Sequence, residues 1–182
     1  MTAALQERLE LFLPRNALTD RIQEMGAEIS RDTGDNSLLL IGVLRGAAVF
    51  FADLARAITA DCIFDFVSIS SYGSHQQPAE VIRTMHPPEE NVADKHVLLV
   101  EDILDTGATI AYLQKQLLAQ RPASLKVAAL LDKPARRKHP VQADYVGFTV
   151  PDRFVVGYGM DYSGHFRGLP DIYYMPQIIQ EE

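Results

Sequence analysis

An apolar run near the middle of the chain ends in acids and leads into a short segment of hydroxyls and glycine. Glu101 and Asp102 follow the apolar residues 97–100, Asp105 comes three residues later, and residues 106–109 read Thr-Gly-Ala-Thr. If a helix begins in this last segment, its first backbone N–H groups and the two hydroxyls form a seat for an anion. A glycine there lets the backbone approach a ligand closely. The segment therefore predicts a phosphate site.

The two adjacent acids need a second explanation, because carboxylates beside this seat would repel a phosphate. Carboxylates accept hydrogen bonds from hydroxyls and ligate hard cations, so a ribose, or a sugar together with Mg²⁺, would satisfy both halves of the segment. The alternative is that Asp102 or Asp105 only caps the helix, since Asp is a preferred N-cap residue.

Composition and charge limit the classes of protein. A chain of 182 residues suits one domain, residues 1–182, with a substantial core. The net charge of −7 disfavours broad nucleic-acid binding and leaves a small anionic substrate open. No apolar run approaches the ~20 residues of a membrane span, and the first residues lack the pattern of a secretory signal. The single cysteine, Cys62, excludes an intrachain disulfide framework. We therefore expect a cytoplasmic protein without membrane partners.

Three segments have the spacing of helices that bury one face. The first places Leu18, Ile22, Met25 and Ile29 on one side and ends at Gly34. Two further helices are expected over residues 46–58 and 108–121. Their predicted inward residues are Val49, Leu54 and Ile58 in the first, and Ile110, Leu113, Leu117 and Leu118 in the second.

Continuous apolar runs bounded by turn residues predict buried strands between these helices. They cover residues 37–44, 96–101 and 125–131. Residues 62–72, rich in β-branched and aromatic side chains, are predicted as a further strand, with shorter strands at 144–150, 153–158 and 171–175 and a possible return strand at 81–86. The alternation predicts an α/β fold with a mainly parallel central sheet flanked by helices. Ligands bind beyond the carboxyl ends of such strands, which is where the acids lie.

The whole segment 97–110, VLLVEDILDTGATI, closely resembles the phosphoribosyl-pyrophosphate (PRPP) motif of type I phosphoribosyltransferases. That motif is an apolar strand, two acids, two residues, Asp-Thr-Gly, one residue and Thr. The resemblance extends over roughly residues 38–175. It implies the type I phosphoribosyltransferase fold, with a small hood of N- and C-terminal segments.

Other loops resemble the hypoxanthine-guanine phosphoribosyltransferases in particular. Residues 42–46 (GVLRG) are similar to their pyrophosphate loop and residues 70–74 (SSYGS) to the start of their mobile active-site loop. Residues 130–137 (LLDKPARR) and 144–162 (DYVGFTVPDRFVVGYGMDY) resemble their purine-binding region. The last stretch separates enzymes for 6-oxopurines from those for adenine, orotate or uracil.

The resemblance implies a role for each residue of the PRPP motif. Glu101 and Asp102 would hold ribose hydroxyls and Mg²⁺, and Asp105 would be the catalytic acid or base at the purine imidazole nitrogen. The 5′-phosphate would be cradled by Thr106, Gly107, Ala108 and Thr109.

It also implies the purine and pyrophosphate contacts. Lys133 would donate to the 6-oxo group, Phe154 would stack on the base, and the Val155 carbonyl would accept from the base edge. Asp161 would lie at the purine site and ligate a second Mg²⁺. Pyrophosphate would be bound by Leu44, Arg45, Gly46 and Arg167, with Arg137 a weaker candidate, and Ser71 and Tyr72 would close over the reacting centre.

Simpler interpretations exist for several of these residues. Phe154 suits a core position and Asp161 a turn, while residues 136–138 (Arg-Arg-Lys) suit a solvated loop. Arg45 stands where many members of the family have Lys, which changes the donor geometry.

The activity implied is Mg²⁺-dependent purine salvage. PRPP and hypoxanthine or guanine would give IMP or GMP and pyrophosphate, in a homodimer or homotetramer. One alternative is a non-enzymatic, nucleotide-sensing regulator on the same fold. A second is a phospho-acceptor signalling domain, which requires its acid pair on an earlier strand.

Overall fold

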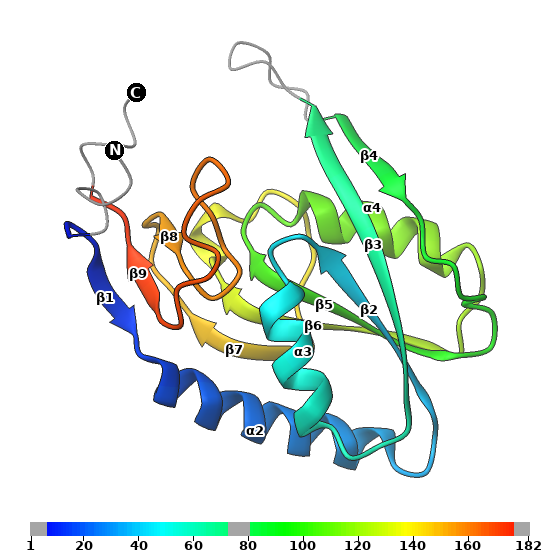
Figure 1. Cartoon of the computed structure of the whole chain (residues 1–182). Coiled ribbons are helices and arrows are strands. Elements are labelled where there is room, and N and C mark those ends of the chain that lie inside the picture. Colours follow the sequence, from blue (N-terminus) through cyan, green and yellow to red (C-terminus); the bar gives the residue numbers. More distant parts are fainter. Residues whose placement is uncertain (1–6, 73–80, 177–182) are drawn as a thin grey trace.

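A six-stranded sheet forms the centre of the computed structural model, which describes residues 7–72 and 81–176 (Figure 1). The strand order is β4-β3-β2-β5-β6-β7, with β4 antiparallel to β3 and every other pair parallel. This confirms the predicted α/β fold with a mainly parallel sheet. The strands are β2 (Leu38–Leu44), β3 (Cys62–Tyr72), β4 (Val81–His86), β5 (His96–Leu104), β6 (Ser124–Asp132) and β7 (Tyr145–Thr149).

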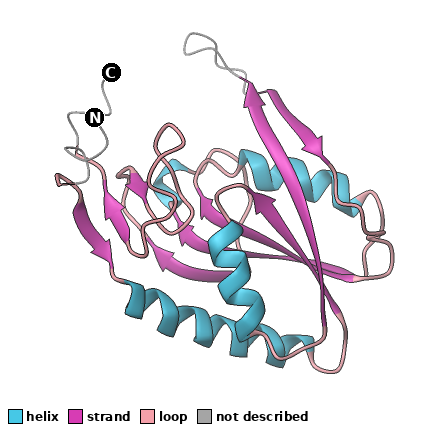
Figure 2. Cartoon of the chain, viewed as in Figure 1, coloured by secondary structure: helices cyan, strands magenta, loops and turns pink. Residues whose placement is uncertain are grey.

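Helices cover both faces of this sheet (Figure 2). The helices α2 (Arg15–Thr33) and α3 (Ala48–Ala57) pack on one face, and α4 (Ala108–Leu118) packs on the other. Because successive side chains of a strand point to opposite faces, Leu40 joins the core under α2 and α3, whereas Leu39 joins the core under α4. Both faces of β2 are therefore buried, as its continuous apolar run predicted.

The first predicted helix is confirmed in position and in its buried face. All four of its predicted inward residues are buried in α2. The helix ends where Gly34 adopts a φ of 58°, and the Gly34 N–H donates to the carbonyl of Ser30 over 3.1 Å. A positive φ favours glycine, which is why the chain stops there.

Two predicted inward residues were wrong. Val49 is exposed because α3 buries Phe50, Phe51 and Leu54 instead, and this stripe leaves position 49 on the outer side. Leu118 is exposed because α4 ends at that residue and Leu117 occupies the core position beside it.

A second, three-stranded antiparallel sheet confirms the predicted hood of terminal segments. Its order is β1-β9-β8, formed by β1 (Glu10–Leu13), β8 (Val155–Val156) and β9 (Ile172–Tyr174). Phe12 stacks on Tyr174 with 4.2 Å between ring centroids. Figure 1 shows this sheet beside the end of β7. Val155 and Tyr174 belong to the same core as α2, so the hood is packed onto the main sheet.

A short 3-10 helix, η1 (Pro134–Arg136), follows β6. None of the described helices has the length and apolar character that a membrane crossing requires.

Candidate active site

A cavity of about 420 Å³ lies at the carboxyl ends of β5 and β6. It is the edge of the sheet at which ligands were expected. Six residues singled out in the sequence meet there although they are up to 59 positions apart. The lining consists of Asp102, Ile103, Asp105, Lys133, Arg136, Asp152, Phe154, Val155, Met160 and Asp161.

The adjacent acids lie within β5, which continues past them to Leu104. Glu101 is buried, and its Oε2 has no hydrogen-bond partner within residues 7–72 and 81–176. Burial, with the charge of Asp102 adding to it, raises the pKa of Glu101 well above its usual value. Burial also raises the pKa of Asp102 to about 6, against the hydrogen bond that the Ile103 N–H donates to Oδ1 over 2.8 Å. A buried acid next to a half-buried one is costly unless a ligand uses them.

The turn after β5 leads directly into α4. Gly107 is the N-cap residue with a φ of 83°, and a Cβ there would lie 2.5 Å from Cγ2 of Val141. Only glycine suits both restrictions. The first turn of α4, which is described throughout, contains no acidic side chain. No acidic side chain of the first turn therefore opposes an anion at this helix start, where the Ala108 N–H donates to the Thr106 hydroxyl over 3.3 Å. The phosphate site itself stays a prediction.

The loop after β6 holds this turn in place. The Arg137 guanidinium donates to the carbonyls of Leu104 and Asp105 over 2.9 and 2.6 Å and pairs with Asp132. The backbone N–H groups of Lys138 and His139 both donate to the Thr106 carbonyl. The sequence suggested Arg137 as a weaker pyrophosphate contact. In the structure it supports the backbone next to residues 106–109, the predicted phosphate seat, which we call the phosphate turn.

Lys133 is a buried cation beside the cavity. Its Nζ donates to the carbonyl of Arg153 over 2.7 Å, and its own N–H donates to the carbonyl of Leu104 over 3.0 Å. Burial lowers the pKa of Lys133, while the charge of Asp105 opposes that shift. An ammonium has three hydrogens, so two stay available to a ligand.

The Phe154 ring is exposed on the wall of the cavity and does not belong to the core. The side chain is 40% exposed, and its ring meets Tyr162 edge-on with centroids 5.9 Å apart. Val155, the next residue, is buried in β8. The core interpretation of Phe154 was therefore wrong.

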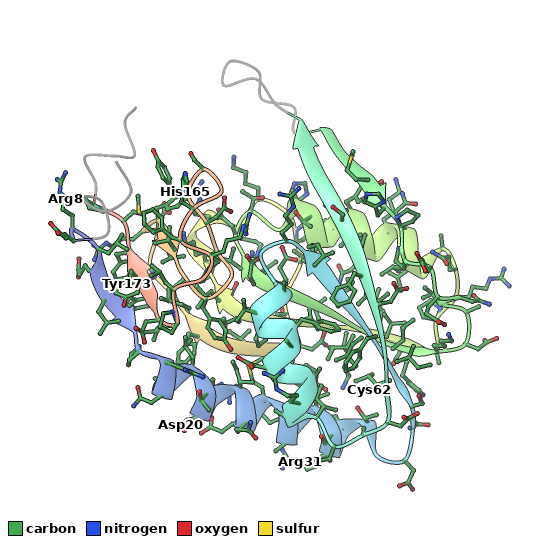
Figure 3. The ribbon with its side chains drawn as sticks, viewed as in Figure 1. Arg8, Asp20, Arg31, Cys62, His165 and Tyr173 are labelled. Carbon is green, nitrogen blue, oxygen red and sulfur yellow. The ribbon has the colours of Figure 1, made fainter. Side chains whose placement is uncertain are left out.

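Asp161 combines a turn role with a place in the cavity wall. Its Oδ2 accepts from the Gly164 N–H over 2.6 Å, as the turn interpretation expected. Its Oδ1 pairs with Arg167 Nη2 at 2.6 Å, and Arg167 Nη1 donates to the Gly159 carbonyl over 2.6 Å. Figure 3 shows His165, from the same loop, far from Arg31 and Cys62 at the opposite end of the molecule.

The Leu44-Arg45-Gly46 loop follows β2 and touches both the acids and this turn. The Leu44–Arg45 peptide bond is cis. A Cβ on Gly46 would lie 1.8 Å from Oδ2 of Asp102, and a Cβ on Gly159 would lie 2.2 Å from the Gly46 carbonyl oxygen. The predicted pyrophosphate loop thus lies between the PRPP acids and the segment that carries Asp161.

The predicted mobile loop is the part of the site that the structure does not describe. The strand β3 ends with Ser71 and Tyr72, of which the structure describes the backbone alone. Their side chains and residues 73–80 lie outside the described residues.

Four lining residues were missed in the sequence: Ile103, Arg136, Asp152 and Met160. Arg136 and Asp152 lie close in the sequence to two predicted purine-site residues, Lys133 and Phe154. Single charged residues in loops carry no periodic signal, so nothing distinguished these two from solvated side chains.

The carboxylates of the site suit a cation that takes its other ligands from a substrate. Among the described residues, no three His, Cys, Asp or Glu side chains form a ready metal site. Asp102 and Asp161 line one cavity, and Glu101, the residue before Asp102, has a buried Oε2 without a partner among the described residues. Mg²⁺ is commonly held by one or two carboxylates with the remaining ligands from substrate oxygens and water, so these residues suit it.

Comparison with known proteins agrees with this geometry. The phosphoribosyl transferase domain matches residues 12–163. A hypoxanthine phosphoribosyltransferase of Escherichia coli (strain K12) is 38% identical over 171 residues, which cover 92% of this chain and 96% of that protein. A hypoxanthine-guanine phosphoribosyltransferase of Bacillus subtilis (strain 168) is 37% identical over 172 residues, covering 94% and 96%.

A solved structure extends the likeness to the fold. A hypoxanthine phosphoribosyltransferase from Staphylococcus aureus matches with a TM-score of 0.92 at 34% identity, over 98% of each chain. The chain therefore belongs to the phosphoribosyltransferase family and, within it, to the hypoxanthine-guanine phosphoribosyltransferases.

Proposed function

We propose that this protein transfers the phosphoribosyl group of PRPP to hypoxanthine or guanine, forming IMP or GMP and pyrophosphate. The observation that carries the proposal is a single cavity. It brings a stacking ring, Phe154, and a buried donor, Lys133, together with the acids of the PRPP motif.

The phosphate turn and β5 would bind PRPP. The N–H groups and hydroxyls of Thr106, Gly107, Ala108 and Thr109 would hold the 5′-phosphate, because helix starts bind anions. Glu101 and Asp102 would accept hydrogen bonds from the ribose hydroxyls. The free Oε2 of Glu101 supports this role, since a buried oxygen without a partner gains most from a donor.

The hood and the loop after β6 would bind the base. Phe154 would stack on the purine, and the Val155 carbonyl and Asp161 would face its edge. Lys133 would donate to the 6-oxo group. An ammonium cannot accept a hydrogen bond from a 6-amino group, so this contact would disfavour adenine.

The pyrophosphate would lie against the loop Leu44-Arg45-Gly46, with Arg167 contributing a forked donor. Glu101, Asp102 and Asp161 would hold Mg²⁺, which, when bound, neutralises charge on the pyrophosphate leaving group. The Arg45 side chain is exposed at this loop and would add a second cation.

In the reaction, the bond between the anomeric carbon and pyrophosphate breaks through an oxocarbenium-like state. A purine nitrogen bonds to that carbon from the opposite face, and Asp105 accepts the proton that the purine loses. Ser71 and Tyr72 would close over the site and exclude water, which would otherwise hydrolyse PRPP. The role of this pair stays a prediction.

A panel of bases tests the proposal. We expect product with PRPP, Mg²⁺ and hypoxanthine or guanine, and none with adenine, orotate or uracil. Turnover of adenine or a pyrimidine without any 6-oxopurine would contradict it. The alternative, a non-enzymatic regulator, predicts nucleotide binding without pyrophosphate release, whereas the three relatives named above are phosphoribosyltransferases by name.

We further propose that the chain functions as a homodimer or homotetramer. Support comes from an apolar groove of about 360 Å³ between α3 and β3, lined by Phe51, Phe64, Phe66 and Leu44 among others. Phe64 is 53% exposed on this face. Exposed apolar surface rich in aromatic rings is typical of interfaces, and a second copy is the occupant that we propose.

We also propose that residues 1–182 form one domain, because residues of the hood and of the main sheet share one core. The cytoplasmic location stays a prediction.

A further inference from the structure

Arg136 is a charged residue that neither the sequence nor the proposed binding roles explain. It ends η1, three residues after Lys133, and its side chain lines the cavity. Its guanidinium contacts two carboxylates. Nε lies 2.9 Å from Oδ1 of Asp105 in an ion pair, and Nη1 donates to Oδ1 of Asp152 over 3.2 Å.

These contacts join two walls of the cavity. Asp105 follows β5, whereas Asp152 lies between β7 and β8, just before Phe154. A planar guanidinium can offer separate N–H groups to two carboxylates at once, which a lysine ammonium on its flexible stem does less well. Arg136 therefore couples the acid–base side of the cavity to the side that holds the base.

The two oxygens of Asp105 differ in their surroundings. Oδ1 is buried and accepts no hydrogen bond from the described residues, and its close contact is the ion pair with Arg136 Nε at 2.9 Å. The whole side chain is nevertheless 37% exposed, so its exposed part includes Oδ2 and not Oδ1. Among the described residues, no hydrogen bond to Oδ2 is present. The ion pair with Arg136 therefore restrains one oxygen, and the other stays open to the cavity.

The backbone of Asp105 is already fixed by Arg137, which donates to its carbonyl over 2.6 Å. Arg137 cannot set the side-chain torsions from that position. Lys133 acts on Asp105 through its charge, but its Nζ is bonded to the Arg153 carbonyl. Within the described residues, Arg136 is the cation in direct contact with the Asp105 carboxylate.

We propose that Arg136 is a positioning residue for proton transfer: it holds Oδ1 of Asp105 so that Oδ2 faces the purine nitrogen. The inference rests on the proposed function and adds a residue to it. Asp152 holds the other side of the guanidinium. Catalytic groups must be kept close to their reactive geometry, and a misplacement of about 1 Å can reduce the rate about 100-fold.

The test is steady-state kinetics of Arg136→Ala and Arg136→Lys with hypoxanthine and PRPP. We expect kcat of Arg136→Ala to fall about 10- to 100-fold while the KM for PRPP stays within about twofold. Arg136→Lys restores one contact but not both, so its kcat should be intermediate. Guanidinium ion at low concentration should partly restore kcat of Arg136→Ala and leave wild type unchanged, an effect that a structural role would not produce.

Two further variants sharpen the test. Asp152→Asn should lower kcat in the same direction by less, and should add little to Arg136→Ala, because both changes break one arrangement. Arg31→Ala removes an arginine in the last turn of α2, far from His165 in the loop after Asp161 (Figure 3), and should leave kcat unchanged.

The outcomes separate this inference from the proposed function. If wild type turns over hypoxanthine and Arg136→Ala retains its kcat within about twofold, the inference is wrong and the function stands. If kcat falls without rescue by guanidinium, or if the KM for PRPP rises instead, Arg136 has a structural or binding role and the inference is also wrong. If wild type turns over no 6-oxopurine, both are wrong.

Discussion

Gly46 lies so close to Asp102 that no side chain fits between them: a Cβ on Gly46 would be 1.8 Å from Oδ2 and 2.7 Å from Cγ of that carboxylate. The two residues come from the ends of neighbouring parallel strands, β2 and β5. Their contact aligns the proposed pyrophosphate loop with the acids that would hold ribose and Mg²⁺. Each side of the site therefore depends on the position of the other.

We expect Gly46→Ala to lower kcat/KM for PRPP by about 100-fold, since the loop or Asp102 must move by about 1 Å or more. Overpacking of this kind also costs about 1–3 kcal/mol of stability. Kinetics and thermal melting measure both effects. Gly168→Ala is the matched control, because a Cβ there meets nothing within 4 Å. Equal kinetics for the two variants would show that the loop tolerates the side chain.

Glu101→Gln should raise the melting temperature and lower activity. The pKa of Glu101 is raised in the folded protein by burial and by Asp102, so the unfolded chain ionises at lower pH than the folded one. Stability is therefore present below the unfolded value and is lost as the pH rises through the folded value. Glutamine is neutral at every pH, so the variant buries no charge at this position. Each kcal/mol of stability gained in this way raises the melting temperature by about 2–4 °C.

Melting curves of wild type and Glu101→Gln at pH 4.5 and pH 7.5 check this sign. The advantage of the variant should be larger at pH 7.5. An advantage that is independent of pH would mean that the carboxylate is not destabilising in the fold. Glu28→Gln, on an exposed face of α2 and paired with Arg21, serves as control and should not raise the melting temperature.

Asp105→Ala should reduce turnover by about 10²- to 10⁴-fold, the usual contribution of a well-placed acid–base group. Binding of PRPP should be almost unchanged, because the phosphate turn is held by backbone contacts from the loop after β6. Single-turnover kinetics and a PRPP titration measure the two quantities. Turnover close to wild type would remove Asp105 from the mechanism.

Lys133→Ala should raise the KM for hypoxanthine and guanine more than the KM for PRPP. The ammonium is buried next to the base site and donates to the Arg153 carbonyl. The variant loses the donor for the 6-oxo group and leaves that carbonyl unpaired. Steady-state kinetics with each substrate varied in turn provide the measurement, and equal changes in both constants would argue against a contact with the base.

Phe64→Glu should yield a smaller assembly than wild type in light scattering after size exclusion. A charge on the apolar groove would have to be desolvated in an interface between two copies. Leu118→Glu is the control, since Leu118 is 57% exposed on α4, which packs on the opposite face of the sheet from α3. The proposed interface is wrong if Phe64→Glu keeps the mass of wild type.

Local pattern was sufficient for most of the fold. Buried strands such as β2 and β5 are continuous apolar runs, and α2 repeats its apolar residues at helical spacing, so their type and place follow from neighbouring residues alone. The strand β1 was not expected, because a four-residue edge strand is too short to show alternation. It exists because β9 offers a partner.

The sequence alone determined the order of the elements, the phosphate turn after β5 and the resemblance that assigned roles to residues from 44 to 167. These depend on short-range spacing and on motifs of a few residues. Only the tertiary structure decided that Gly46 touches Asp102, that Phe154 faces a cavity and that Arg136 contacts both Asp105 and Asp152. Such contacts join residues that are 16 to 56 positions apart, and they arise from how the strands align and where the loops fold back, which no local pattern of residues records.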